Sequence, residues 1–116
     1  MKNSRFQRRL GFAIAGLWEG WRRERSFRTQ VAAAAFALIT LCVVRPPAVW
    51  WAIIALVTAV VLAMELFNSA LETLIDHLHP DQHPQIRIVK DMAAAGVLLV
   101  AIAAVLIAVT LIVTVV

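Results

Sequence analysis

Residues Ala48 to Asp76 read AVWWAIIALVTAVVLAMELFNSALETLID, and the architecture follows from this stretch. It is apolar up to Met64 and carries acidic and amide side chains thereafter. A membrane-crossing helix needs about 20 predominantly apolar residues, so the stretch is long enough to span. The whole chain agrees, because 62% of its 116 residues are hydrophobic and 16% are charged, whereas soluble domains average roughly 45–50% and 25%. The composition argues against a soluble monomer.

Two further apolar runs flank this stretch. Val31 to Val44 ends at Arg45-Pro46-Pro47, where the prolines impose a turn, and Met92 to Val116 follows a polar loop. The first run must recruit the residues before it to reach spanning length. We predict a single all-α integral membrane domain over 1–116, with spans at 27–45, 48–76 and 88–114 and a cytoplasmic loop at 77–87.

The N-terminal segment has the pattern of an amphipathic helix that lies on the membrane surface. Large apolar residues recur every three or four positions, which places them on one helical face. Basic residues fall mostly on the other faces, as in interfacial helices. We predict this surface helix over 4–24, with its apolar face formed by Phe6, Leu10, Ile14, Leu17 and Trp21.

The distribution of Lys and Arg predicts the orientation, because short cytoplasmic loops carry the excess of these residues. Most of the 11 basic residues precede the first span, the first turn holds Arg45, the second loop and its end hold Arg87 and Lys90, and the C-terminus holds none. We therefore expect a bacterial inner-membrane protein with the N-terminus and second loop in the cytoplasm and the C-terminus outside. A basic end beside an apolar body suits anionic lipid headgroups, and we expect no nucleic-acid partner.

Polar residues form one stripe at the inner end of the second span: Glu65, Asn68, Glu72 and Asp76. At about 100° per residue, they lie within roughly 80° of one another along about 16 Å of helix. An acid at the bilayer centre costs about 2.5–3.5 kcal/mol, so the stripe requires cations, donors or protonation. A helix that emerges into water explains Asp76. It explains Glu65 poorly, because Glu65 directly follows the apolar run.

The predicted topology brings other polar residues to the same inner surface. Glu24 and Arg28 lie where the surface helix meets the first span, and Lys90-Asp91 opens the third. Carboxylates with retained waters suit Mg²⁺, which usually also binds a substrate phosphate, and Lys or Arg can bind that phosphate directly. A carboxylate at the membrane boundary can act as a general base toward a lipid hydroxyl. The residues favour phosphoryl transfer at the membrane surface, with a proton pathway as an alternative.

The stripe and the residues after it resemble a known signature. ELFNSALETLID at 65–76, His83-Pro84 and KDMAAA at 90–95 resemble the prokaryotic diacylglycerol kinase family, which also contains undecaprenol kinases. Upstream, AIAGL at 13–17 and ERSFR at 24–28 resemble the N-terminal motif of that family. The resemblance implies a small three-span kinase, commonly a homotrimer, that uses Mg·ATP to phosphorylate a lipid alcohol.

Carried over by position, the resemblance assigns roles to individual residues. Glu65 is similar to the general base that acts on the lipid hydroxyl, and Glu24 and Glu72 are similar to the ligands that hold ATP through Mg²⁺. The residues implied at the nucleotide are Arg5, Phe12, Glu24, Asn68, Glu72, Asp76, Asp81, Gln82, His83, Lys90 and Asp91. Those implied at the lipid are Trp21, Phe27, Arg28, Glu65 and Ala94.

Three positions depart from the family pattern. Phe12 stands where some members carry tyrosine, Gln82 where an aromatic residue occurs, and Ala94 where serine can occur near the lipid. These changes leave the implied base and metal ligands intact. The resemblance therefore supports the chemistry better than the identity of the lipid.

The acceptor lipid divides the family. The His83-Pro84 pair and residues 93–96 resemble the undecaprenol branch, whereas the basic, tryptophan-containing N-terminal helix resembles the diacylglycerol branch. We predict diacylglycerol as the acceptor, giving phosphatidic acid, with undecaprenol as the alternative. A non-catalytic membrane bundle or accessory subunit is the alternative of another class.

Overall fold

The computed structural model describes residues 2–116, with side chains from Arg5 onward, and this part of the chain folds into four helices. The helix α1 spans Lys2–Arg23, α2 spans Arg25–Val44, α3 spans Ala48–Leu78 and α4 spans Pro84–Val115. The helices α2, α3 and α4 are each long and apolar enough to cross a membrane. The predictions of an all-α protein and of three candidate spans are therefore confirmed.

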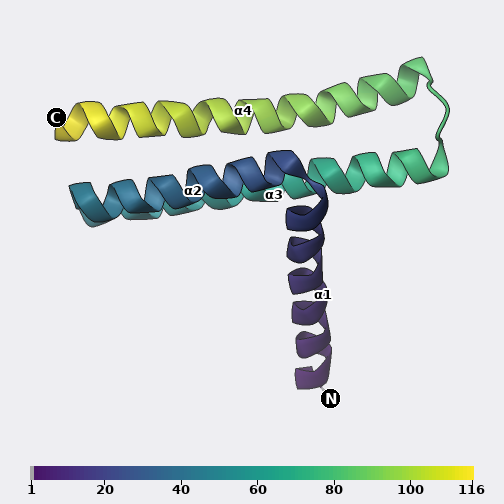
Figure 1. Ribbon diagram of the computed structural model, residues 1–116, viewed down its shortest axis with the longest axis horizontal. Helices are drawn as coiled ribbons and strands as arrows, with labels where there is room; N and C mark the ends of the chain where they lie inside the picture. Colours follow the sequence, from purple (N-terminus) through teal and green to yellow (C-terminus); the bar gives the residue numbers. More distant parts are fainter. Residues whose placement is uncertain (1) are drawn as a thin grey trace.

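The three candidate spans lie alongside one another, and α1 projects from them at a steep angle (Figure 1). The most extensive helix contact joins α3 to α4, and α2 also packs on α3. The junction between α1 and α2 lies about midway along α3, where α1 touches both helices (Figure 1). This junction brings N-terminal residues to the point at which α3 changes from apolar to polar.

Local sequence explains how the spans begin and end. Arg45 closes α2 in the left-handed conformation, with φ of 52°, and its N–H donates to Leu41 O at 2.8 Å. The prolines that follow cannot continue the helix, and α3 begins at Ala48 as predicted. The second loop is shorter than the predicted 77–87, because α3 continues to Leu78 and α4 already begins at Pro84. Proline is favoured in the first turn of a helix.

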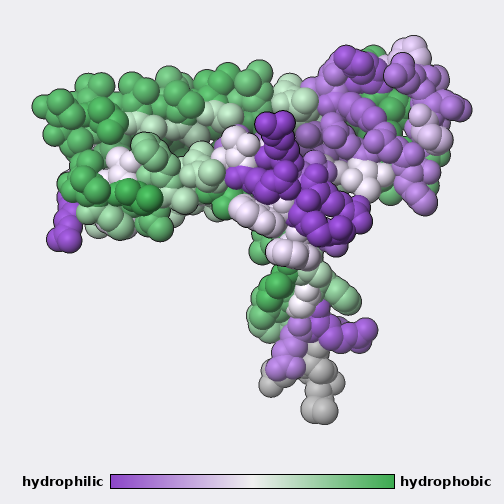
Figure 2. Space-filling view, viewed as in Figure 1, coloured by the Kyte–Doolittle hydropathy of each residue, from purple (hydrophilic) through white to green (hydrophobic). Residues whose placement is uncertain are grey.

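Few side chains are buried within the single chain. The buried apolar residues are Phe27, Leu41, Ile54, Val61 and Leu111, whereas many large apolar side chains of the spans are exposed. Figure 2 shows hydrophobic atoms covering the end of the layer that contains the C-terminus. Hydrophilic atoms gather over the α1–α2 junction and the α3–α4 loop. The molecule therefore has an apolar end, suited to lipid, and a polar end that carries the candidate site.

Gly20 sets how closely α1 approaches α3. A Cβ atom at this position would lie 2.6 Å from Leu66 Cδ2, so the flexible end of the Leu66 side chain would have to move aside. Gly20 is buried, and Phe27 of α2 is its other close neighbour. The absence of a side chain lets the last turn of α1 rest on α3 at Leu66.

Candidate active site

Glu65 lies buried at the point where the apolar part of α3 ends. It is 5% exposed and is the single buried charged residue within the described chain. Its Oε2 accepts a hydrogen bond from the Ser26 hydroxyl of α2 at 3.1 Å. A buried charge is costly unless it is paired and hydrogen-bonded, and the Ser26 hydroxyl supplies one such hydrogen bond. Sequence reasoning predicted the importance of Glu65 but assigned no role to Ser26.

Asn68 lies one turn further along the stripe. Its side-chain Oδ1 is buried and finds no hydrogen-bond partner within the described part of the chain. An unsatisfied buried acceptor costs roughly 1–3 kcal/mol. This carbonyl oxygen is therefore suited to a hydrogen bond from a ligand or a water molecule, or to a cation.

Glu24 lies at the junction between α1 and α2. Its backbone is extended, with φ of −109°, and its side chain makes no capping hydrogen bond to α2. Glu24 lines a groove of about 530 Å³ between α1 and α3, together with Gly16, Gly20, Ser69 and Thr73. Ligand pockets commonly measure about 300–1,000 Å³. The groove is therefore large enough for part of a nucleotide.

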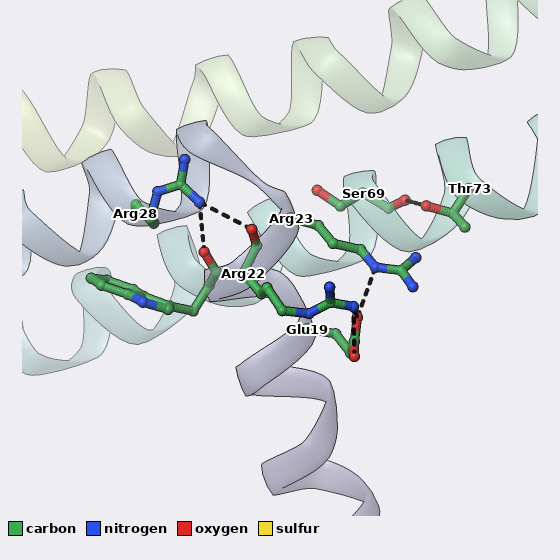
Figure 3. A network of polar contacts seen from close by, with 7 residues as sticks. Glu19, Arg22, Arg23, Arg28, Ser69 and Thr73 are labelled. Carbon is green, nitrogen blue, oxygen red and sulfur yellow. Dashed lines mark hydrogen bonds and ion pairs between the residues drawn. The ribbon is translucent and has the colours of Figure 1, made fainter.

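An ion-pair network lies at the end of α1 beside this groove (Figure 3). Glu19 pairs with Arg22 at 2.9 Å and with Arg23 Nε at 2.7 Å. The hydrogen bond from Arg22, with the positive charges of both arginines, lowers the pKa of Glu19 below its usual 4.5. Arg23 and Glu19 line the same groove as Thr73, so this ion pair contributes one positive and one negative side chain to the groove wall.

Arg28 makes a different contact from the lipid contact that the resemblance implies. Its Nη1 donates to the backbone oxygens of Trp21 at 2.8 Å and Arg22 at 3.3 Å (Figure 3). These carbonyls belong to the last turn of α1, where helical partners are lacking. In this structure, Arg28 therefore fixes the angle between α1 and α2.

The ends of α3 and α4 that flank their connecting loop meet through an ion pair. Lys90 Nζ lies 2.6 Å from Asp76 Oδ1, and Arg87 Nε lies 3.2 Å from Asp91 Oδ1 within α4. A second hollow, of about 440 Å³, lies beside this pair. Its lining includes five residues predicted at the nucleotide, which are Asp76, Asp81, Gln82, His83 and Lys90.

The remaining predicted site residues are more dispersed. Phe12 lies on the projecting part of α1 and is 70% exposed, and Arg5 is exposed on the same helix. Phe27 is buried, whereas Trp21 and Ala94 are exposed. The structure therefore places Glu24 in the groove between α1 and α3 and buries Glu65 beside Ser26 of α2. It gathers a second group at the α3–α4 loop, and it leaves Arg5 and Phe12 exposed on α1.

Magnesium is the metal that the family resemblance implies. Within the described part of the chain, no group of three or more His, Cys, Asp or Glu side chains lies close enough to form a metal site. Mg²⁺ is usually bound through one or two carboxylates plus substrate phosphates. Glu24 and Glu72 are both half-buried, and neither forms an ion pair with a described Lys or Arg. Glu24 faces the groove between α1 and α3, whereas Glu72 and Asn68 are not among the residues that line this groove.

The structure thus combines three helices long enough to cross a membrane with a buried acid and a polar end. Residues 11–112 match the family described as "Prokaryotic diacylglycerol kinase", and the chain belongs to this family. It is therefore a membrane lipid kinase.

Individual relatives support the same assignment. The chain is 34% identical over 99 residues to an undecaprenol kinase of Bacillus subtilis, and these residues cover 85% of this chain and 80% of that protein. It is 28% identical over 103 residues to a diacylglycerol kinase of Escherichia coli K12, covering 89% and 84%. A diacylglycerol kinase of Synechocystis is 33% identical over 97 residues, covering 83% of this chain and 55% of that protein.

Proposed function

We propose that this kinase transfers the γ-phosphate of ATP to a lipid hydroxyl, with Glu65 as the general base. The observation that carries the proposal is the burial of Glu65, which is 5% exposed at the apolar-to-polar boundary of α3. A carboxylate there meets a lipid hydroxyl at headgroup level and can accept its proton as the oxygen attacks phosphorus. The proton passes from the lipid oxygen to Glu65, and the lipid oxygen–phosphorus bond replaces the bond to ADP.

The nucleotide binds at the cytoplasmic end of the site in this proposal. Glu24 and Glu72 would hold Mg²⁺ against the phosphates of ATP, and bound Mg²⁺ neutralises charge on the transferring group. Two observations support this placement, namely the groove beside Glu24 and the Asn68 oxygen that lacks a partner in the described chain. Lys90 is a point charge suited to phosphate. Asp81, Gln82, His83 and Asp91 are proposed at the remainder of the nucleotide.

The helix α1 is proposed to lie on the cytoplasmic membrane surface. Its steep angle to the spans supports this (Figure 1), because α1 would lie near the membrane plane when the spans cross it. Its apolar side chains are also unburied, with Phe6 67% and Ile14 58% exposed. The N-terminus and the second loop are cytoplasmic and the C-terminus is outside in this arrangement, which follows from the distribution of Lys and Arg.

Self-association as a trimer is part of the proposal. The spans leave large apolar side chains uncovered, and Glu72 and Asn68 are only half shielded within one chain. Further helices would cover the polar stripe from lipid, where uncompensated charge is costly. Chemical cross-linking in detergent and in bilayers tests this, with a ladder ending at three subunits expected.

Diacylglycerol is proposed as the acceptor, and undecaprenol is the second candidate. The basic, tryptophan-bearing α1 supports the first, and the 34% identity to the Bacillus subtilis undecaprenol kinase supports the second. The test is ATP-dependent phosphate transfer in mixed micelles, with each lipid offered separately and Mg²⁺ present or absent. Mg²⁺-dependent product from diacylglycerol supports the proposal. Product from undecaprenol alone would make undecaprenol the acceptor. Folded protein that forms no product from either lipid would contradict the proposed lipid kinase activity.

A further inference from the structure

One polar contact joins the first turn of α2 to the proposed base in α3. The Ser26 hydroxyl donates to Glu65 Oε2 at 3.1 Å, although the two residues are 39 positions apart in the sequence. Among the described residues, no Lys or Arg forms an ion pair with Glu65. Ser26 is therefore the one side-chain donor that the described chain offers to this buried carboxylate.

The Ser26 contact gives the two carboxylate oxygens of Glu65 different surroundings. Oε2 is engaged by Ser26, which leaves Oε1 for a second hydroxyl. A general base must lie within about 2.6–3.2 Å of the atom whose proton it accepts. Because a carboxylate is planar, fixing one oxygen also fixes the direction in which the other oxygen points.

We propose that Ser26 is a positioning residue, which holds Glu65 so that Oε1 faces the hydroxyl of the acceptor lipid. The inference rests on the proposed role of Glu65 as general base. Ser26 itself touches neither ATP nor the reacting phosphorus in this scheme. Its hydroxyl is neutral and offers one donor, so it does not compete with the lipid hydroxyl for the second oxygen of Glu65.

The position of Ser26 also links the base to the proposed metal ligand. Ser26 follows Glu24 by two residues in the first turn of α2. The Glu24 N–H donates to Gly20 O at 2.9 Å, and the Arg28 N–H donates to Glu24 O at 3.2 Å. The backbone around Glu24 is therefore held on both sides. Through Ser26, the same short segment sets where Glu65 lies relative to the metal-binding end of the site.

An isosteric pair of variants tests the hydroxyl itself. Ser26→Thr keeps the donor, whereas Ser26→Val has the shape of threonine without it, and the exposed position of Ser26 leaves room for the added methyl group. Ser26→Ala removes the hydroxyl without adding bulk. Thr29→Ala is the matched control, because Thr29 lies one turn further along α2 and its hydroxyl bonds only the Arg25 carbonyl, at 3.1 Å.

We expect Ser26→Val and Ser26→Ala to lower kcat by about 10- to 100-fold, as for loss of a hydrogen bond to a charged group. The KM for ATP should stay within about twofold, because a loss confined to the chemical step leaves substrate binding unchanged. Ser26→Thr and Thr29→Ala should turn over like the parent protein. If the contact were merely structural, Ser26→Val would be less stable than Ser26→Thr. It would not show a lower kcat at an unchanged KM for ATP.

The opposite results would overturn the inference. Equal kcat values for Ser26→Val and Ser26→Thr would show that the hydroxyl does not matter. A rise in KM for ATP at unchanged kcat would place Ser26 in nucleotide binding instead. ATP binding, titrated on each variant, counts the folded sites, so the Thr–Val comparison holds even if Ser26→Ala folds poorly. Glu65→Gln, assayed in parallel, separates the two proposals. A fully active Glu65→Gln would show that Glu65 is not the base. An inactive Glu65→Gln together with a fully active Ser26→Val would contradict only the role of Ser26.

Discussion

Replacing Lys90 by methionine should affect nucleotide binding far more than stability. Lys90 Nζ lies 2.6 Å from Asp76 Oδ1, with the two side chains 31% and 64% exposed. Two unit charges 2.6 Å apart in water attract by about 1.6 kcal/mol, and ordering a lysine side chain costs up to about 2 kcal/mol. Exposed ion pairs accordingly contribute about 0.2–1 kcal/mol. The Lys90–Asp76 ion pair therefore contributes little to the stability of the protein.

We expect Lys90→Met to lower the free energy of unfolding by less than about 1 kcal/mol. Its affinity for Mg·ATP should fall at least about tenfold, because a charge-assisted contact to phosphate counts for roughly 1.5–3 kcal/mol. Denaturant unfolding in detergent measures the first quantity, and titration calorimetry measures the second. Asp76→Asn breaks the same ion pair but keeps the cation, so its ATP affinity should fall less. A loss of stability above about 2 kcal/mol with unchanged ATP affinity would refute this reasoning.

Three further predictions concern the α1–α3 region. Glu24→Ala and Glu72→Ala should each lose Mg²⁺-dependent ATP binding, measured by calorimetry with and without Mg²⁺, and an unchanged Mg²⁺ dependence in both would remove them as ligands. Gly20→Val should destabilise the protein by at most about 1 kcal/mol in thermal unfolding, the low end of overpacking, because the end of the Leu66 side chain can move aside; a larger loss would show that this contact is rigid. Because its arginine partners lower the pKa of Glu19 below 4.5, the stability that this network adds is present above the unfolded-state pKa and is lost as pH falls through the folded-state value. Helicity followed by circular dichroism should show this acid-induced loss in the parent protein and not in Glu19→Gln.

Much of the architecture could be predicted because composition and helical periodicity act locally. The apolar runs predicted three spans, and Pro46-Pro47 predicted the turn between α2 and α3. The predicted loop at 77–87 is longer than the segment between α3 and α4, because the polar residues at both of its ends are typical of loops but belong to helices. Pro84 and the His83 side chain, which accepts from Gln85 N–H at 3.1 Å, instead begin α4 early.

The polar stripe was predictable because its residues share one helix, whereas contacts between residues of different helices were not. The stripe from Glu65 to Asp76 follows from helical periodicity alone. The Ser26–Glu65 contact spans 39 residues and depends on how α2 packs against α3, which no local pattern reports. Arg28 likewise caps the end of α1 in the structure, because the bend after Arg23 leaves carbonyls there without helical partners.

Turnover by Glu65→Gln tests the central claim most directly. Glutamine keeps the shape of glutamate and can still accept from Ser26, and it removes a charge from a position that is 5% exposed, so folding and ATP binding should persist. Phosphate transfer from ATP to the acceptor lipid should fall by at least about 10²-fold, the contribution typical of a general base. Parent-like transfer by folded, ATP-binding Glu65→Gln would contradict the account.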